Sequence, residues 1–168
     1  MIRVKEYVTG PLRAADGGKT VAASDDNKRQ AEDDGCVLTL DGERSDIDML
    51  HRFMADAAGR FGWNARTQHH LTLACEELLT NIISYGYPQG GIPRIRLSAA
   101  AAEGGVRLVL EDNAAAFDPL GQPDPDLTLD LDSRPIGGLG VYFVKRLMDD
   151  VRYERLPSGN RLTMIKYE

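Results

Sequence analysis

The chain has 168 residues, of which 42% are hydrophobic and 27% are charged, so we expect one soluble globular domain. Its net charge of −6 argues against nucleic acid as the main partner, because a phosphate backbone is bound by a basic surface. No apolar run approaches the roughly 20 residues that span a bilayer, and the N-terminus lacks the layout of a signal peptide. We therefore expect a cytoplasmic protein that does not contact a membrane.

Two cysteines, Cys36 and Cys75, lie far apart in the sequence, and neither belongs to a Cys-x-x-Cys pair. This arrangement argues against a disulfide framework and against a zinc site. We expect both to be small buried residues of a protein from a reducing compartment.

The first 35 residues differ in composition from the rest. Residues 9–35 are rich in Gly, Ala, Asp, Lys and Ser, and such a stretch buries too little apolar surface to offset its ordering entropy. We predict a disordered N-terminal tail at 1–35 and a single domain at 36–168. The alternative for the tail is a short extended piece near residues 2–8 that pairs with another segment.

The domain is expected to begin with a strand and two helices. Residues 37–40 have the composition of a strand and are followed by a turn signal. The first helix is expected to begin at Ser45, which has an acid three places on, and to end at Gly62. The second is expected to run from its N-cap Asn64 to about Tyr85, because its apolar residues recur at helical spacing.

The second half of the domain is expected to hold four more strands and one more helix. Apolar and polar residues alternate along the first of these strands, which predicts one buried face. The stretch from Asp112 to Gly138 is irregular, and a loop of this length inside a compact domain is usually functional or disordered. The expected ranges are strands at 94–99 and 106–111, a helix at 139–148 and a closing hairpin of strands at 151–156 and 161–167.

The resulting order, β-α-α-β-β-α-β-β, disfavours a doubly wound parallel sheet, because helices and strands do not alternate one for one. We predict an α+β fold, a two-layer α/β sandwich. Its mostly antiparallel mixed sheet of about five strands would be covered on one face by three helices.

Glu77 and Asn81 are four residues apart in the second expected helix, so they share one face of it. An amide oxygen suits Mg²⁺, which takes oxygen ligands, and a carboxylate can accept a proton from a nucleophile. The alternative interpretation is the solvated face of an amphipathic helix.

Asp112 ends a strand that we expect to be buried, at a sheet edge where a pocket can open. A carboxylate in that position can accept a hydrogen bond from an exocyclic amine such as that of adenine. The alternative is an ordinary aspartate that caps a turn.

The turn Gly137-Gly138-Leu139-Gly140 leads into the last expected helix. Glycines let a backbone approach a ligand closely, and a helix N-terminus presents N–H groups and a positive dipole end to phosphate. The turn does not follow a strand and has no third glycine, so the dinucleotide-binding fingerprint is not met. No Lys-Ser or Lys-Thr follows it, as a P-loop requires.

These three features, in this order along the chain, resemble the GHKL or Bergerat ATP-binding fold of gyrase, Hsp90, histidine kinases and MutL. Within that group the chain is most similar to anti-sigma-factor serine/threonine kinases, over roughly residues 37–167. The similarity rests on an N box at 74–81, on Phe117-Asp118-Pro119 after Asp112, and on a G2 box with its closing strands at 137–155.

The resemblance implies a role for each group. Asn81 would ligate Mg²⁺, Glu77 would be the general base, and Asp112 would bind the adenine amine. Residues 119–137 would form a lid over the ATP. The implied nucleotide-binding residues are Asn81, Asp112, Ala114, Phe117, Gly137, Gly138, Leu139 and Gly140.

Two positions depart from the pattern of this family. Ala114 stands where glycine is usual, and a Cβ at that position would crowd the adenine ring or require a shifted backbone. Ala116 stands where proline is common.

Several other residues are not assigned to a site. His51, His69 and His70 have no neighbouring Cys, Asp or Glu cluster that would complete a metal site, so we expect them at the surface or at its boundary with the core. We expect Trp63 to anchor two helices.

The leading hypothesis is a serine protein kinase that uses ATP and Mg²⁺. The resemblance implies that it phosphorylates a small anti-anti-sigma protein of the STAS type, blocks a sigma factor and forms a homodimer. Phosphoryl transfer would be in line, with Glu77 accepting the serine proton.

Two alternatives come from different classes of protein. One is a nucleotide-gated binding module without significant kinase activity. The other is a detached histidine-kinase-like ATPase domain, which is disfavoured because such kinases need dimerisation helices and a phosphoaccepting histidine in cis.

Overall fold

Six strands form one antiparallel sheet, in the order β1-β2-β3-β4-β6-β5. The structure is a computed structural model, and it describes residues 7–9, 35–43, 46–124 and 139–167. The strands are β1 (Tyr7–Thr9), β2 (Cys36–Leu40), β3 (Ile95–Ala102), β4 (Gly105–Asp112), β5 (Asp150–Leu156) and β6 (Gly159–Tyr167). The helices are α2 (Asp46–Phe61), α3 (Ala65–Tyr85) and α4 (Leu139–Leu147).

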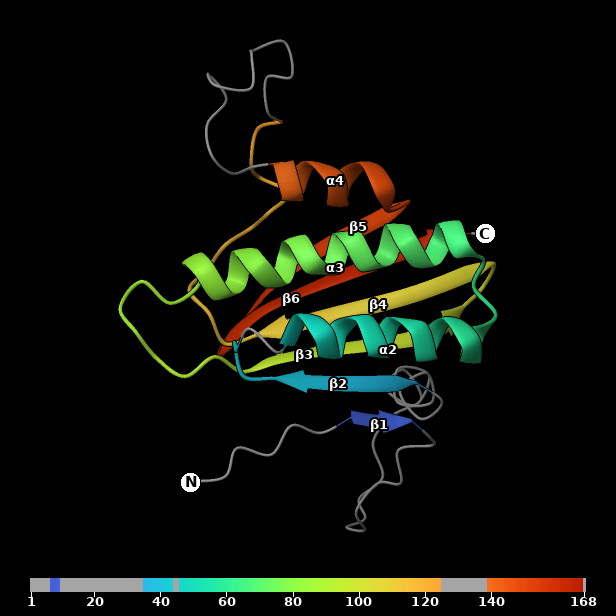
Figure 1. The fold of residues 1–168 in the computed structure, drawn as a ribbon. Helices are drawn as coiled ribbons and strands as arrows, with labels where there is room; N and C mark the ends of the chain where they lie inside the picture. Colours follow the sequence, from blue (N-terminus) through green and yellow to red (C-terminus); the bar gives the residue numbers. More distant parts are fainter. Residues whose placement is uncertain (1–6, 10–34, 44–45, 125–138, 168) are drawn as a thin grey trace, which may run out of the picture.

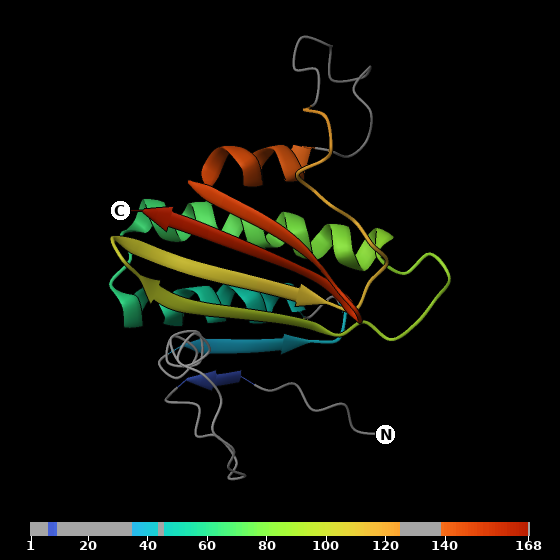
Figure 2. The ribbon, with the colours of Figure 1, turned by 180° about the vertical axis from the view of Figure 1, so that it is seen from behind.

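The three helices lie together on one face of the sheet (Figure 1). Seen from behind, the opposite face carries no helix among the described residues (Figure 2). This asymmetry follows from the period of two along each strand. In β3, Ile95, Leu97 and Ala99 are buried, whereas Arg96 and Ser98 are half-buried. The core therefore lies between the sheet and the helical layer.

Polar side chains bond to backbone N–H groups at the start of both long helices, in the turn before α2 and in the first turn of α3. At the start of α2, the buried Asp46 carboxylate accepts from the backbone N of Gly42 at 2.8 Å and of Glu43 at 3.0 Å. At the start of α3, Asn64 Oδ1 accepts from the backbone N of Thr67 at 2.9 Å, as expected for an N-cap. The expected cap at Ser45 lies outside the described residues.

The predicted two-layer α+β fold with three helices is confirmed. The sheet holds one strand more than the five or so expected, because β1 pairs with β2, with Val8 opposite Val37. All pairings between the described strands are antiparallel. The expected sheet was mostly antiparallel but mixed, and no parallel pair occurs among these strands. Apart from Gly35, the rest of the expected N-terminal tail lies outside the described residues, as does most of the expected lid.

Both cysteines are free and buried, as expected. Burial raises the pKa of Cys75 to about 12, so this thiol is a packing residue and not a nucleophile. Trp63 is also buried, stacked on Phe61 with ring centroids 6.0 Å apart, which agrees with an anchoring role. None of the described helices is long and apolar enough to cross a membrane.

Candidate active site

Glu77 and Asn81 lie one turn apart on α3, and both are half-buried, whereas their neighbours Leu78 and Leu79 are in the core. Within the described part of the chain, neither polar side chain has a hydrogen-bond partner. A carboxylate and an amide are thus held beside each other with their polar atoms unused. This differs from the adjacent Glu76, which bonds to His51 and thereby links α3 to α2.

Gly140, in the first turn of α4, packs directly on Glu77. A Cβ at position 140 would lie 2.5 Å from Glu77 Oε2 and 2.8 Å from Glu77 Cβ, so no larger residue fits without moving the carboxylate. The contact brings the N-terminus of α4, with its positive dipole end, close to the middle of α3. Gly137 and Gly138 lie outside the described residues, and Leu139 begins α4.

Asp112 ends β4, opposite Ile95 of β3 and Asn160 of β6. Its Oδ1 accepts two hydrogen bonds, from the backbone N of Ala114 at 2.8 Å and from Asn160 Nδ2 at 2.7 Å. The first is the bond of an ordinary turn-capping aspartate, but the second is not. Burial raises the pKa of Asp112, although the bonds from Asn160 and Ala114 and the charge of Arg155 oppose the rise.

Sequence reasoning missed Asn160, which it placed in the hairpin turn before an expected strand at 161–167. The turn is shorter than expected, because Leu156 pairs with Gly159 and β6 begins at Gly159. Asn160 is therefore a strand residue at the end of the sheet, and it is buried. The one signal in the sequence was the Gly-Asn pair, which reads equally well as a turn.

Ala114 is buried against the C-terminal end of α3. A Cβ at Gly86 would lie 2.8 Å from the Cβ of Ala114, so the missing side chain of Gly86 makes room for this methyl group. The next residue, Ala115, donates its N–H to the carbonyl of Gly86 at 2.9 Å. The segment after β4 is thereby fixed to the helix that carries Glu77 and Asn81.

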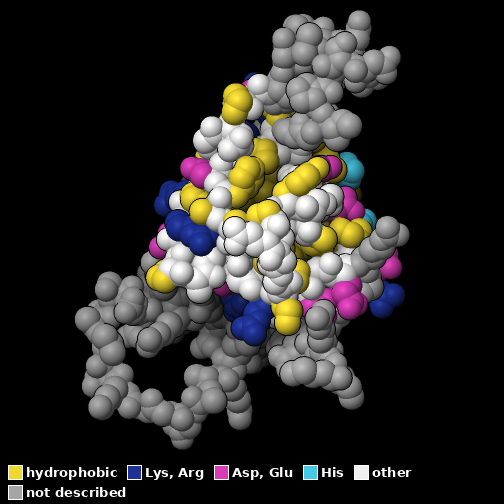
Figure 3. All heavy atoms as spheres, turned by 90° about the vertical axis from the view of Figure 1, so that its left-hand side faces the viewer, with side chains coloured by type: hydrophobic (Ala, Val, Ile, Leu, Met, Phe, Trp, Pro, Cys, Tyr) yellow, Lys and Arg dark blue, Asp and Glu magenta, His cyan; other side chains and the backbone are white. Residues whose placement is uncertain are grey.

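Three large hydrophobic side chains from this end of the molecule are exposed, namely Tyr85, Ile92 and Phe117. Figure 3 looks at the end where α3 stops, and hydrophobic side chains gather over it. Phe117 is 48% exposed, while its backbone N bonds to Asn160 Oδ1 at 3.4 Å.

The described part of the expected lid is tied to α4. Lys145 Nζ donates to the carbonyl oxygen of Gln122 at 2.6 Å and lies 3.4 Å from Asp124 Oδ1. Just before the expected lid, Asp118 accepts from the backbone N of Leu120 at 2.8 Å. Asp118 and Asp124 therefore both have partners, and the other three aspartates of residues 118–132 lie outside the described residues.

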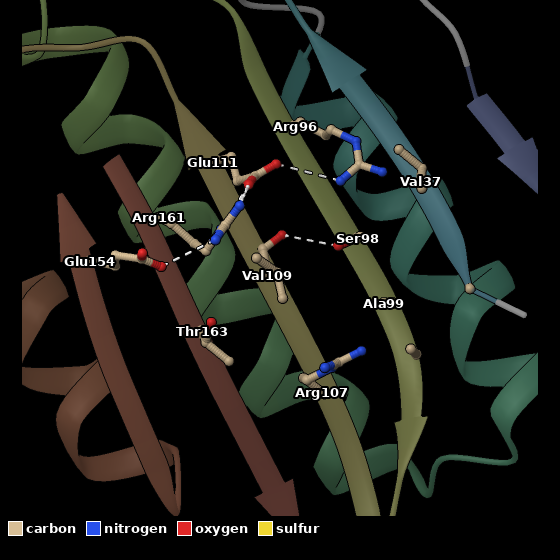
Figure 4. Close-up of a pocket in the computed structure, with 12 residues that line it drawn as sticks. Val37, Arg96, Ser98, Ala99, Arg107, Val109, Glu111, Glu154, Arg161 and Thr163 are labelled. Carbon is tan, nitrogen blue, oxygen red and sulfur yellow. Dashed lines mark hydrogen bonds and ion pairs between the residues drawn. The ribbon is translucent and has the colours of Figure 1, made fainter. Parts of the chain in front are cut away.

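A hollow of about 240 Å³ lies elsewhere, on the face of the sheet without helices. It is lined by ion pairs, with Glu111 lying between Arg96 and Arg161 (Figure 4). No residue of the expected site lines it. The hollow therefore lies apart from the residues of α3 and α4 that form the candidate site.

A family model described as the histidine kinase-like ATPase domain matches residues 43–166. The chain belongs to this family. The resemblance to the GHKL fold is thereby confirmed, and the matched residues span the elements from α2 to β6 that carry Glu77, Asp112 and Gly140.

Curated relatives of this ATPase domain are named as protein kinases. This chain is 33% identical over 105 residues to the serine/threonine-protein kinase BtrW of Bordetella bronchiseptica, and the match covers 62% of this chain and 74% of that protein. It is 27% identical over 127 residues to the serine-protein kinase RsbW of Bacillus subtilis, covering 72% of this chain and 78% of that protein.

A solved structure gives independent support for the fold. The crystal structure of the RsbU and RsbW domains of a Mycobacterium tuberculosis protein matches with a TM-score of 0.55 and 17% identity. The match covers 79% of this chain and 31% of that one.

Proposed function

We propose that the chain is an ATP- and Mg²⁺-dependent serine protein kinase and anti-sigma regulatory factor. It would phosphorylate an anti-anti-sigma partner of the STAS type and sequester a sigma factor or a similar regulator. The observation that carries this proposal is the contact of Gly140 with Glu77 at the N-terminus of α4. The names of the two kinase relatives support it.

Asp112 suits the adenine amine. An ionised carboxylate only accepts hydrogen bonds, and the two described donors to Asp112 both use Oδ1. Ala114 stands where this family usually has glycine, and its methyl group would weaken nucleotide binding if it lay against the adenine ring. Its packing on Gly86 supports retained nucleotide binding, because the methyl group already has its space against α3.

Asn81 fits Mg²⁺ by its chemistry, since the residue is only half-buried and a hard cation takes oxygen ligands such as its amide oxygen. Among the described residues no cluster of three His, Cys, Asp or Glu side chains could hold a metal alone. Asn81 would therefore share the ion with the phosphates of the nucleotide. A bound Mg²⁺ offsets the negative charge of those phosphates during transfer.

Glu77 is the residue for proton transfer. Its carboxylate lies beside the first turn of α4, where free N–H groups favour the phosphate oxygens of a nucleotide. A serine hydroxyl presented between the phosphate and Glu77 would lose its proton to the carboxylate as its oxygen attacks the γ-phosphorus. The bond from the γ-phosphorus to the oxygen that bridges it to the β-phosphate would break, and ADP would leave. Gly140 keeps the helix backbone close enough for both events.

The partner and the assembly are inferred from the resemblance. We expect the kinase to act as a homodimer and to recognise a STAS-type protein by a serine on its surface.

Incubation of the purified chain with a STAS-type protein and labelled ATP tests the proposal. We expect label on the partner, lost when its acceptor serine is replaced by alanine and when Glu77 is replaced by glutamine. A chain that binds ATP but transfers no phosphate to any STAS-type protein of the same genome would favour the nucleotide-gated binding module.

A further inference from the structure

Asn160 occupies a junction between the strand that ends at Asp112 and the segment that follows it. It is 6% exposed, and its side-chain amide takes part in five hydrogen bonds. We propose that Asn160 is a positioning residue that fixes the Asp112 carboxylate so that the site prefers a 6-amino purine to a 6-oxo purine. This inference rests on the proposed nucleotide site.

The orientation of the amide is determined by its surroundings. Nδ2 donates to Asp112 Oδ1 at 2.7 Å and to the carbonyl oxygen of Ala115 at 2.9 Å. Oδ1 accepts from Tyr153 Oη at 2.8 Å and from Arg155 Nη1 at 2.9 Å. In a flipped amide, the N–H donors would face the guanidinium of Arg155 and the oxygen would face the carboxylate of Asp112. Only the observed orientation avoids both conflicts.

This enforced orientation acts on Asp112. Asn160 Nδ2 and the backbone N of Ala114 both bond to Oδ1, which sets the plane of the carboxylate and leaves Oδ2 as the oxygen without a described donor. An oxygen that only accepts pairs with an exocyclic amine and repels an exocyclic carbonyl. The preference therefore depends on the carboxylate staying ionised.

Asn160 favours that ionised form through its geometry, because a donor aimed at Oδ1 stabilises the carboxylate and not the acid. Arg155 adds a positive charge, held next to the same amide by its bond to Asn160 Oδ1. A protonated Asp112 would carry an O–H able to donate to a 6-oxo purine. Loss of the Asn160 donor should therefore weaken binding of the amino purine and strengthen, in relative terms, binding of the oxo purine.

The backbone around Asn160 supports the same contact. Gly159 packs so closely on the carbonyl of Asp112 that no Cβ fits at position 159. The pairing of Asp112 with Asn160 in the β4–β6 ladder sets their spacing before any ligand arrives. The arrangement is thus built into the sheet.

Binding of Mg·ATP and Mg·GTP by calorimetry tests this inference, with Asn160→Asp as the main variant. The change keeps the shape but replaces the donor to Asp112 Oδ1 by an acceptor. We expect the ratio of the GTP Kd to the ATP Kd to fall by at least about tenfold, since a site built to bond a polar group discriminates strongly. Asn160→Ala is the second variant, and it should lower the ratio without adding a charge.

Asn113→Asp is the matched control. Asn113 is the residue next to Asp112, so the same amide-to-carboxylate change can be made beside the site. Its amide bonds to Ile92 and Arg94 in the 86–94 loop and not to the Asp112 carboxylate. Its ratio should stay within about twofold of the native value, because both donors to Asp112 Oδ1 are kept.

A second readout needs no nucleotide. The NMR titration of the Asp112 carboxyl carbon should move to higher pH in Asn160→Asp and in the uncharged Asn160→Ala. It should move less in Asn113→Asp, which adds a neighbouring charge but keeps the Asn160 donor to Oδ1. Equal weakening of both nucleotides by Asn160→Asp, with an unmoved titration, would overturn the inference and leave Asn160 a structural residue. A native chain that binds neither nucleotide, with the titration moved as expected, would instead overturn the proposed function.

Discussion

Gly140 and Glu77 touch across the boundary between α4 and α3, and a Cβ on the glycine would lie 2.5 Å from the carboxylate oxygen Oε2. The two residues are far apart in sequence, so their contact results from the packing of α4 beside α3 on the same face of the sheet (Figure 1). It joins the two features that chemistry alone would assign to proton transfer and to phosphate binding.

Gly140→Ala should reduce phosphoryl transfer by at least about tenfold, because the new methyl group displaces the Glu77 carboxylate. Alanine favours a helix over glycine by about 1 kcal/mol. A loss of activity in this variant would therefore not result from a less stable α4. The measurement is transfer of label to the partner, together with the melting temperature. Gly59→Ala on α2 is the control, since its Cβ would meet no atom within 4 Å. Equal behaviour of the two variants would contradict the assigned contact.

Glu77→Gln should lower the rate of phosphoryl transfer by about 10²–10⁴-fold, the usual contribution of a general base. The Kd for ATP should change by less than about threefold, because the isosteric amide removes proton acceptance and little else. Glu76→Gln is the matched control. That neighbouring carboxylate bonds to His51 on α2, away from Gly140, so its loss should leave transfer unaltered. A native rate in Glu77→Gln would remove Glu77 from the mechanism.

Nucleotide affinity should depend on pH through Asp112. Burial raises the pKa of this carboxyl above its ordinary 3.8, despite the opposing bonds from Asn160 and Ala114. Affinity should therefore be constant at neutral pH and should fall as the pH drops through that raised pKa, because the protonated acid loses its acceptor role. Calorimetry over a pH series measures this, and Asp112→Asn should lose the step. A step that persists in Asp112→Asn would have to be assigned to another group.

The sequence predicted the local parts of this account well. The acid and amide of α3, the glycine in the first turn of α4 and the strand-ending Asp112 each follow from spacing within one segment, and the Asn64 cap follows from capping chemistry. The two-layer fold follows from the order of the elements and their hydrophobic periodicity.

The parts that were missed depend on contacts between distant segments. Asn160 bonds to Asp112 across 48 residues, so nothing in its local sequence marks its role. The same dependence on a distant segment holds for β1, whose three residues become a strand only by pairing with β2, a pairing that the sequence offered near residues 2–8 only as the alternative to a disordered tail. It also holds for the packing of Ala114 on Gly86, which decides what a methyl group at that position costs.

The most direct test of the central claim is calorimetry of Mg·ATP with the native chain, Asp112→Ala and Asn81→Ala. The first variant removes the proposed adenine acceptor, and the second removes the proposed amide ligand of the ion. We predict a Kd in the micromolar range for the native chain and no measurable binding for either variant. No heat of binding for the native chain up to millimolar ATP, or native affinity in both variants, would contradict the account.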